Sequence, residues 1–438
     1  MSWREDYAKK RMSMDELMGL IHDGDRIVIQ SGDAASYPIM QAMYDRREQM
    51  HGVTVYSVLL TKESPISRPE CNGHINQVSP FLSAGERNAI ADGSRIGVML
   101  VQLNDLMRAW REIIHPNAAI IQVSPPDENG CVSLGTNATG IPEFIDTYER
   151  VIAQVNKNVP YIRGEYSTIH VSKLSGYVEL DTEMVKEANR PPSEKDLKIA
   201  GYIVDMIKDG SCIQLGAGGV PTAVGTFLKD KRHLGIHTEM LAESMMDLIE
   251  CGAVDNSMKK LLPGKSIFVF SGLTDKHRKM FSEHPELLET RSFEWVNDPY
   301  VIAQNDRAVS INSALTCDLT GQVCSESIGP RQYSGVGGQL NFVRGAQLSR
   351  EGQSYITMYS TYFNKSEQRE MSKISVMLPL GSAVTTPRQD VQYIVTEYGV
   401  ADLRYQTIEN RAKRLIAIAH PDFREELTYE AKKIGWIY

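Results

Sequence analysis

The chain has 438 residues, enough for two or three domains, and its 42% hydrophobic and 23% charged residues are typical of an ordinary globular enzyme. Its formal net charge is −8, from 47 basic and 55 acidic residues without a basic block, which argues against nucleic acid as the main partner. The start is charged, without the apolar core of a signal peptide, and the apolar runs are too short to span a bilayer. We therefore expect a cytoplasmic protein with no membrane partner.

A strand–loop–helix unit opens each half of the chain. Residues 20–30 indicate a helix end, an Asp-Gly turn and a strand, and a small-residue loop and Pro38 follow. Residues 206–215 have the same pattern, and Pro221 follows them. We interpret the two openings as a duplication; chance similarity over these few positions is the alternative.

Short aliphatic and β-branched runs alternate with helical stretches in both halves, which is typical of parallel sheets covered on both faces. Paired prolines among charged residues predict an interdomain linker over residues 186–195. We therefore predict an α/β protein of two open domains with mostly parallel sheets, residues 1–187 and 188–438. Such sheets bind ligands at the carboxyl ends of their strands. The further runs assigned to strands are residues 53–56, 119–123, 151–155, 266–270, 308–311 and 393–396.

A first glycine loop, residues 216–221, follows the strand that opens the second half. A dinucleotide-binding loop needs glycine or alanine where this loop has Pro221. The loop is better interpreted as backbone donors at a helix N-terminus, suited to a phosphate, a carboxylate or a thioester oxygen.

Glu239 lies in the apolar, strand-like run of residues 234–241. Hydration makes a carboxylate a weak nucleophile, but a carboxylate held in an apolar strand and facing backbone N–H groups can attack an acyl carbon. The alternative is a solvent-facing or salt-bridged acid at a strand end.

A second glycine loop, residues 325–346, contains glycines at 335, 337 and 338, which permit positive φ and close approach to a ligand. A turn between strands is the alternative. Glu397 follows an apolar strand as Glu239 does, and either acts as a second active-site acid or pairs with a nearby arginine. The chain ends in two predicted amphipathic helices, residues 408–419 and 422–433, with His420 as a turn or cap residue.

The six cysteines are scattered without a C-x-x-C pair, so we expect reduced thiols and no metal site. Cys324 lies close to the second glycine loop, and a reactive thiol there is the alternative.

Together these segments resemble the acetyl-CoA hydrolase/transferase family, in particular its 4-hydroxybutyrate and butyrate CoA-transferase branch. The resemblance implies two similar α/β domains with the active site between them, the second carrying the catalytic glutamate, and a homodimer or homotetramer. The segments that carry it are residues 123–127, 216–221, 234–240, 329–346, 396–404 and 419–423.

The resemblance also implies the site residues. Glu239 falls on the family's nucleophile, and Glu397 on its second active-site acid. Asn312, Gly337 and Gly338 fall where the family contacts the substrate and its oxyanion. The positions implied to bind CoA are Gly216, Ala217, Gly218, Gly219, Val220 and Ser334.

The implied activity is transfer of CoA from an acyl-CoA to a small carboxylate (acetate, butyrate, 4-hydroxybutyrate, succinate or itaconate) through a glutamyl-CoA thioester, with no permanently bound cofactor. An acyl-CoA hydrolase using the same glutamate is the alternative, and a non-catalytic CoA-binding sensor is a distant one. Departures at Ala217, Pro330 and residues 32–36 leave the carboxylate open. Arg331, Arg344 and Lys373 either contact CoA phosphates or lie on the surface.

Overall fold

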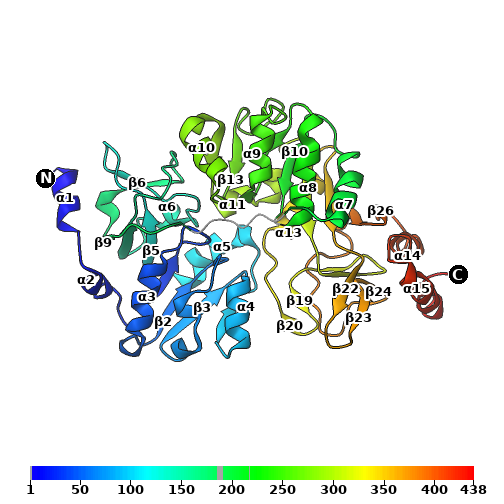
Figure 1. Ribbon diagram of the computed structural model, residues 1–438, viewed down its shortest axis with the longest axis horizontal. Coiled ribbons are helices and arrows are strands. Elements are labelled where there is room, and N and C mark those ends of the chain that lie inside the picture. The colour runs from blue at the N-terminus through cyan, green and yellow to red at the C-terminus, as the bar shows by residue number, and fades with distance from the viewer. Residues whose placement is uncertain (1, 185–190, 217) are drawn as a thin grey trace. The chain divides into compact units, whose positions relative to one another are not determined.

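The computed structural model describes residues 2–184, 191–216 and 218–438, and the chain forms two compact units (Figure 1). One unit comprises Met1–Ala188 and Ile267–Trp295, and the other comprises Asn189–Ser266 and Val296–Tyr438. Ile267–Trp295 therefore packs with the first half of the chain, although the sequence placed it in the second domain. The predicted boundary at 187 and 188 lies outside the described residues, and that division stays a prediction.

The first unit contains a seven-stranded sheet in which every neighbouring pair is parallel. This confirms the parallel α/β fold that the apolar runs predict. In spatial order its strands are β4 (Ile96–Val98), β3 (Ile75–Ser79), β2 (Val53–Tyr56), β1 (Arg26–Ile29), β5 (Ala118–Val123), β7 (Arg150–Val155) and β9 (Gly176–Glu179).

The core of this unit lies where β1 and β2 pack against helix α3 (Tyr37–Asp45). All six residues of β5 are buried, as expected of a strand covered on both faces. Helix α3 begins where Ser36 accepts a hydrogen bond from the N–H of Ile39. The other helices and strands are α1 (Trp3–Lys9), α2 (Met14–Met18), α4 (Ala84–Ala91), α5 (Leu103–Ala109), α6 (Ile141–Phe144), α10 (Asp275–Glu283), α11 (Phe293–Val296), β6 (Cys131–Ser133), β8 (Thr168–His170), β13 (Ser266–Phe268), β14 (Phe270–Ser271) and β15 (Leu288–Thr290).

The second unit contains a six-stranded sheet that is parallel except for its last pair, β25 and β26. In spatial order the strands are β11 (Gly235–Ile236), β10 (Cys212–Leu215), β16 (Ala308–Ser313), β21 (Gln353–Thr357), β25 (Tyr393–Thr396) and β26 (Gly399–Asp402). Strand β11, which precedes Glu239, is therefore at one edge.

Helices α7 (Glu194–Val204), α8 (Gly219–Phe227) and α9 (Glu243–Glu250) lie side by side (Figure 1), and α13 (Gln339–Leu348) packs on β16 and β21. Helix α7 begins inside the predicted linker because Ser193 and Asp196 form a capping box; linker residues 186–190 lie outside the described part of the chain. The remaining elements are α12 (Pro299–Ile302), β12 (Met240–Leu241), β17 (Thr316–Asp318), β18 (Val323–Cys324), β19 (Ser327–Ile328), β20 (Arg331–Gln332), β22 (Thr361–Asn364), β23 (Arg369–Ser372) and β24 (Ile374–Ser375).

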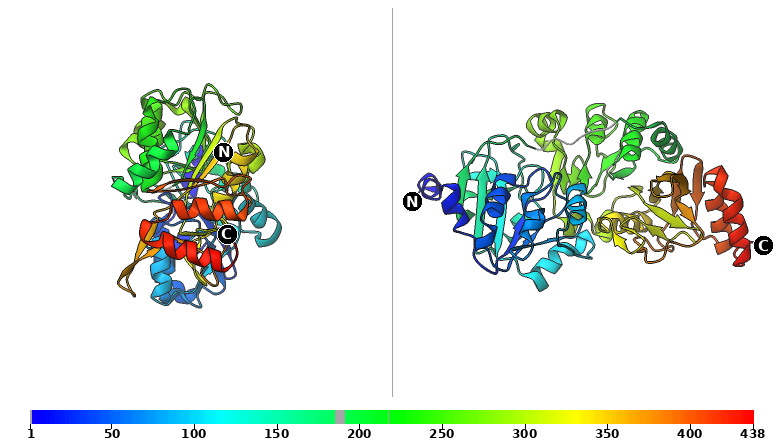
Figure 2. Two further views of the ribbon diagram at one scale, coloured as in Figure 1. Left: turned by 90° about the vertical axis from the view of Figure 1, so that its right-hand side faces the viewer. Right: turned by 60° about the horizontal axis from the view of Figure 1, so that its bottom comes forward.

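The chain ends in helices α14 (Ile408–Ala417) and α15 (Pro421–Lys433), which lie side by side (Figure 2). His420 is the N-cap of α15, and its side chain accepts a hydrogen bond from the N–H of Asp422. The two predicted helices and the cap role of His420 are thus confirmed. None of the helices in the described part of the chain is long and apolar enough to cross a membrane.

The repeated openings occupy equivalent places in the two sheets. Strand β1 lies between β2 and β5 and leads to α3, and β10 lies between β11 and β16 and leads to α8. The predicted strand–loop–helix unit is therefore present twice, while its origin by duplication stays a prediction.

Candidate functional site

Glu239 lies in a bend between the edge strand β11 and the short strand β12, and not within a strand as the sequence suggested. The apolar run is interrupted there because Thr238 turns its hydroxyl back to the carbonyl of Met240 at 3.0 Å. The Glu239 side chain is partly exposed, yet burial of its carboxyl group raises the pKa to about 7. Such a carboxylate is poorly hydrated and therefore more nucleophilic than one in water.

Asn297 holds this carboxylate. Its Nδ2 donates a hydrogen bond of 2.7 Å to Glu239 Oε2, and this bond opposes the rise of the Glu239 pKa. Asn297 is fully buried and immediately precedes the N-cap of α12, Asp298. The sequence does not single out this residue, because Asn-Asp-Pro indicates only the start of a helix.

Gly338 lies against the same carboxylate from the second glycine loop. A Cβ atom at this position would lie 2.0 Å from Glu239 Oε2 and 2.4 Å from Asn297 Nδ2, so any other residue here would displace both groups. Gly338 is also the N-cap of α13, whose N-terminus favours negative charge. The structure therefore brings together Glu239 and Gly338, two residues singled out from the sequence.

The rest of the second loop shapes this contact. Gly337 has φ +60°, a left-handed conformation that favours glycine. Of the three glycines that permit positive φ, Gly337 adopts it, whereas Gly335 and Gly338 do not. Ser334 is buried, and its N–H donates to the carbonyl of Glu326 at 3.0 Å.

His237 anchors the chain between β11 and Glu239. Its Nε2 lies 2.8 Å from the carbonyl oxygen of Val296, so this nitrogen carries the proton. Burial, assisted by the nearby Lys259 ammonium group, lowers the pKa of His237 to about 4, and the ring is therefore neutral near pH 7. Because Val296 precedes Asn297, this bond connects the two segments that hold the Glu239 carboxylate.

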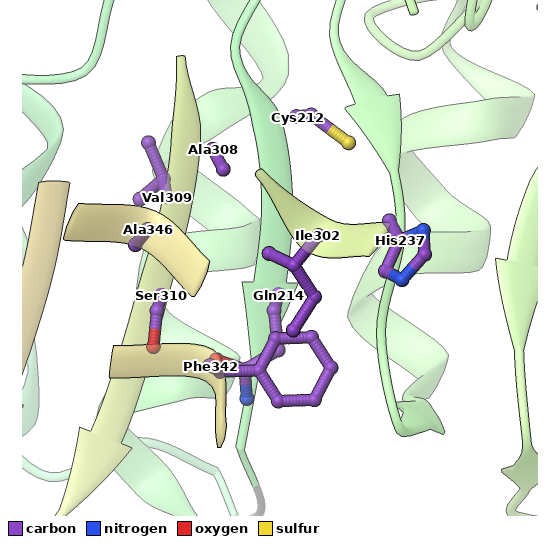
Figure 3. Close-up of a pocket in the computed structure, with 9 residues that line it drawn as sticks. All are labelled: Cys212, Gln214, His237, Ile302, Ala308, Val309, Ser310, Phe342 and Ala346. Carbon is purple, nitrogen blue, oxygen red and sulfur yellow. The ribbon is translucent and has the colours of Figure 1, made fainter. Parts of the chain in front are cut away.

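A small cavity lies behind these residues, and Figure 3 shows the Ile302, Phe342 and His237 side chains at its wall. Its volume of about 10 Å³ is of the order of a single water molecule, so an acyl-CoA cannot enter it. The cavity belongs to the packing of the second unit.

Asn312 lies beside the first glycine loop, at the carboxyl end of β16. Its Nδ2 donates to Ser310 Oγ at 2.8 Å and to Gln214 Oε1 at 3.2 Å. The N–H of Gly216 donates to the carbonyl of Ile311 at 2.9 Å, which places the start of this loop beside Asn312.

The remaining loop residues form the start of α8. Gly218 is its N-cap, Gly219 is its first residue, and Val220 is buried. The expected CoA-binding position Ala217 lies outside the described residues. A CoA-binding role of this loop stays a prediction.

Glu397 lies in a separate part of the second unit. Its carboxylate accepts hydrogen bonds of 2.8 Å from both the N–H and the hydroxyl of Ser360, and Lys195 Nζ lies 3.1 Å away. Although burial alone would raise it, these bonds hold the pKa of Glu397 below its usual range. Strands β10, β16 and β21 lie between β11 and β25, a separation of about 19 Å at the usual strand spacing. Glu239 and Glu397 therefore belong to two separate clusters in this structure, and the pairing partner of Glu397 is a lysine.

The three basic candidates for CoA phosphates differ in environment. Arg344 donates two hydrogen bonds to Asp390, of 3.1 and 3.2 Å, which indicates a surface ion pair. Arg331 is exposed. Lys373 is partly buried beside the Tyr359 ring, and burial lowers its pKa, although the charge of Glu397 opposes this.

The structure also shows the surroundings of Cys324 and of the residue types that could bind a metal. Cys324 is completely buried, and its Sγ lies 3.2 Å from the carbonyl oxygen of Ser327. Across the described residues, no three His, Cys, Asp or Glu side chains gather as a metal site does.

The first unit has a cavity of about 440 Å³ on the carboxyl side of β1 and β5, large enough for a small organic acid. The segment 32–36 contributes Asp33 and Ala35 to this cavity, and Asp33 is buried. The lining residues are Asp33, Ala35, Tyr37, Pro38, Gln41, Lys62, Glu63, Pro65, Gln122, Thr182 and Glu183.

Comparison with known proteins places the chain. Residues 1–188 match the acetyl-CoA hydrolase/transferase N-terminal domain and residues 276–431 match its C-terminal domain. The chain is 37% identical to the 4-hydroxybutyrate coenzyme A transferase of Clostridium kluyveri, over 99% of this chain and 100% of that protein. It is 33% identical to the butyryl-CoA:acetate CoA-transferase of Anaerostipes caccae, over 99% of this chain and 98% of that protein.

Solved structures agree with this placement. The crystal structure of RipA from Yersinia pestis superposes with a TM-score of 0.92 at 35% identity, covering 100% of both chains. An acetyl-CoA hydrolase of Eremothecium gossypii is more distant, at 27% identity over 71% of this chain and 64% of that protein. The chain belongs to the acetyl-CoA hydrolase/transferase family.

Proposed function

We propose that the protein is a CoA-transferase that moves CoA from an acyl-CoA to a small carboxylate, with Glu239 as the nucleophile. The observation that carries this proposal is the Glu239 carboxylate itself, which is held by Asn297 at 2.7 Å, faces Gly338 and has a pKa raised to about 7 by burial. The relatives that match over their full length are named CoA-transferases, and those named hydrolases match less of the chain.

The reaction exchanges one carboxylate for another without a net proton change. The Glu239 carboxylate attacks the thioester carbonyl, which forms an acyl-glutamyl anhydride and releases CoA as a thiolate. The thiolate attacks the glutamyl carbonyl, which forms a glutamyl-CoA thioester and releases the first carboxylate. A second carboxylate attacks this thioester, and the same two steps in reverse release the new acyl-CoA and restore Glu239.

Each tetrahedral intermediate carries an oxyanion that needs hydrogen-bond donors. Backbone N–H groups around Gly337 and Gly338, at the N-terminus of α13, are our candidates, and losing one such donor typically costs about 3 kcal/mol. The first glycine loop and Asn312, which lie beside one another, are our candidates for binding CoA. A contribution of Glu397 and an oligomeric assembly stay predictions from the family resemblance.

The proposal makes the protonation state of Glu239 decisive. Because its pKa is raised to about 7, the carboxyl group is mostly protonated, and not nucleophilic, at pH 6. We expect kcat/KM for the acyl-CoA to rise about tenfold per pH unit below pH 7 and to level off above it.

Trapping the intermediate tests the function. The protein is incubated with acyl-CoA, treated with borohydride and digested, and we expect the reduced residue in the peptide that contains Glu239. Glu239→Gln keeps the shape but not the nucleophile, and we expect at least a 1,000-fold loss of turnover with unchanged circular dichroism. Release of free CoA at the same rate with and without an acceptor carboxylate would contradict transfer and support hydrolysis.

A further inference from the structure

The strand that leads to Glu239 has a partner strand on one side only. Along β11, the N–H groups of Gly235 and His237 donate to Ser211 and Ile213 on the β10 side, at 2.9 and 3.2 Å. The peptide groups of Ile236 therefore point to the outer side, because successive residues of a strand alternate in direction. A buried peptide group at such an edge needs another partner.

Two buried side chains supply that partner. Asn256 Oδ1 accepts a hydrogen bond from the N–H of Ile236 at 2.9 Å, and Lys259 Nζ donates one to the carbonyl oxygen of Ile236 at 2.8 Å. Both side chains are almost completely buried, with exposed fractions of 3% and 5%. The N–H and the carbonyl of one residue, Ile236, are thus both held, three residues before Glu239.

Further contacts fix these two side chains in turn. Asn256 Nδ2 donates to Ser266 Oγ at 3.1 Å, and Lys259 Nζ donates to the carbonyl of Lys265 at 2.6 Å. The backbone N–H of Asn256 donates to the carbonyl of Leu234 at 3.0 Å. The loop of residues 253–266 therefore takes the place of a neighbouring strand.

Gly235 lets the lysine reach across the strand. A Cβ atom at position 235 would lie 2.4 Å from Lys259 Cγ and 2.7 Å from its Cδ. The lysine stem therefore lies directly on the backbone of β11, and any other residue at position 235 would displace it.

We propose that Lys259, with Asn256, is a positioning residue for the transfer reaction: it holds the end of β11 so that the Glu239 carboxylate stays between Asn297 and Gly338. This inference rests on the proposed role of Glu239 as the nucleophile. A stretch of chain this short transmits a shift of β11 to the carboxylate, and small displacements of a reacting group are costly. The Lys259 ammonium group donates to the backbone carbonyls of Ile236 and Lys265, so it acts through the backbone.

The test removes the ammonium group and keeps the stem. We expect Lys259→Met to lower kcat about 100-fold, to change KM for the acyl-CoA less than threefold, and to slow single-turnover formation of the Glu239 thioester by the same factor as kcat. Lys231→Met is the matched control: Lys231 Nζ also donates to a backbone carbonyl of the second unit, that of Ile207 at 2.7 Å. The Lys231→Met variant loses an equivalent hydrogen bond, but one that does not involve Ile236, so its kcat should be unchanged.

Should Lys259→Met not fold, Gly235→Ala displaces the same stem and has the same expected result. A folded Lys259→Met or Gly235→Ala variant with the kcat of the unmodified protein, in which the Glu239 thioester is still trapped, overturns this inference alone. Failure to trap any Glu239 thioester in the unmodified protein overturns the proposed function, and this inference with it.

Discussion

Replacing Asn297 by alanine removes the hydrogen bond that its Nδ2 donates to Glu239 Oε2 at 2.7 Å. A hydrogen bond to a charged group contributes about 1.5–3 kcal/mol, and one pKa unit corresponds to about 1.4 kcal/mol. Because this bond lowers the pKa of Glu239, its loss should move that pKa upward from about 7 by about one to two units.

This shift has a sign and a size that kinetics can measure. At pH 7 about half of the unmodified protein carries an ionised Glu239, whereas the Asn297→Ala variant would carry about a tenth to a hundredth. We therefore expect kcat/KM for the acyl-CoA to fall about 5- to 50-fold at pH 7 and to recover as the pH is raised above 9.

The assay is a profile of kcat/KM from pH 5.5 to 9.5, followed by thioester absorbance. Asn305→Ala is the matched control, since Asn305 is a buried asparagine of the same unit that accepts a bond from Leu261 at 3.1 Å. It should lower stability but leave the midpoint near 7. An Asn297→Ala profile with an unmoved midpoint, lowered equally at every pH, would refute the reasoning.

Two further predictions concern single side chains of the second unit. Gly338→Ala places a methyl group 2.0 Å from Glu239 Oε2, so we expect at least a 100-fold loss of kcat. The control is Gly201→Ala on α7, where a Cβ meets nothing within 4 Å; it should keep full kcat and raise the free energy of urea unfolding by about 0.5–1 kcal/mol. Equal activity of the two variants would contradict this account. Cys251 is exposed whereas Cys324 is buried, so a thiol reagent should modify Cys251 in the folded protein without loss of activity. Peptide mapping that finds Cys324 modified first would show that Cys324 is accessible and contradict its burial.

The elements of the fold that repeat a pattern could be predicted from the sequence. The apolar runs at residues 119–123 and 151–155 form the neighbouring strands β5 and β7. Ser36 and Pro38 mark the start of helix α3, and His420 marks the start of helix α15. These features are local, because a strand's burial and a helix's cap depend on a few adjacent residues.

The features of the site that the sequence did not predict depend on contacts between distant segments. Asn297 meets Glu239 across 58 positions, and nothing in its own neighbourhood distinguishes it from a helix-start asparagine. Lysine is usually a surface residue, but Lys259 is buried against β11. The ion pair of Glu397 with Lys195 also joins residues far apart in the chain, and an active-site role of Glu397 stays a prediction.

The interruption of the first unit by residues of the second has a consequence for biosynthesis. Ile267–Trp295 completes a unit that began at the N-terminus, although Asn189–Ser266 leaves the ribosome before it. The nascent chain must therefore carry two unfinished cores at once until translation has passed residue 295, which differs from the usual order in which N-terminal domains finish first. A fragment ending at residue 188 would lack the part of its unit formed by Ile267–Trp295, so truncation there is a poor way to obtain the first unit alone.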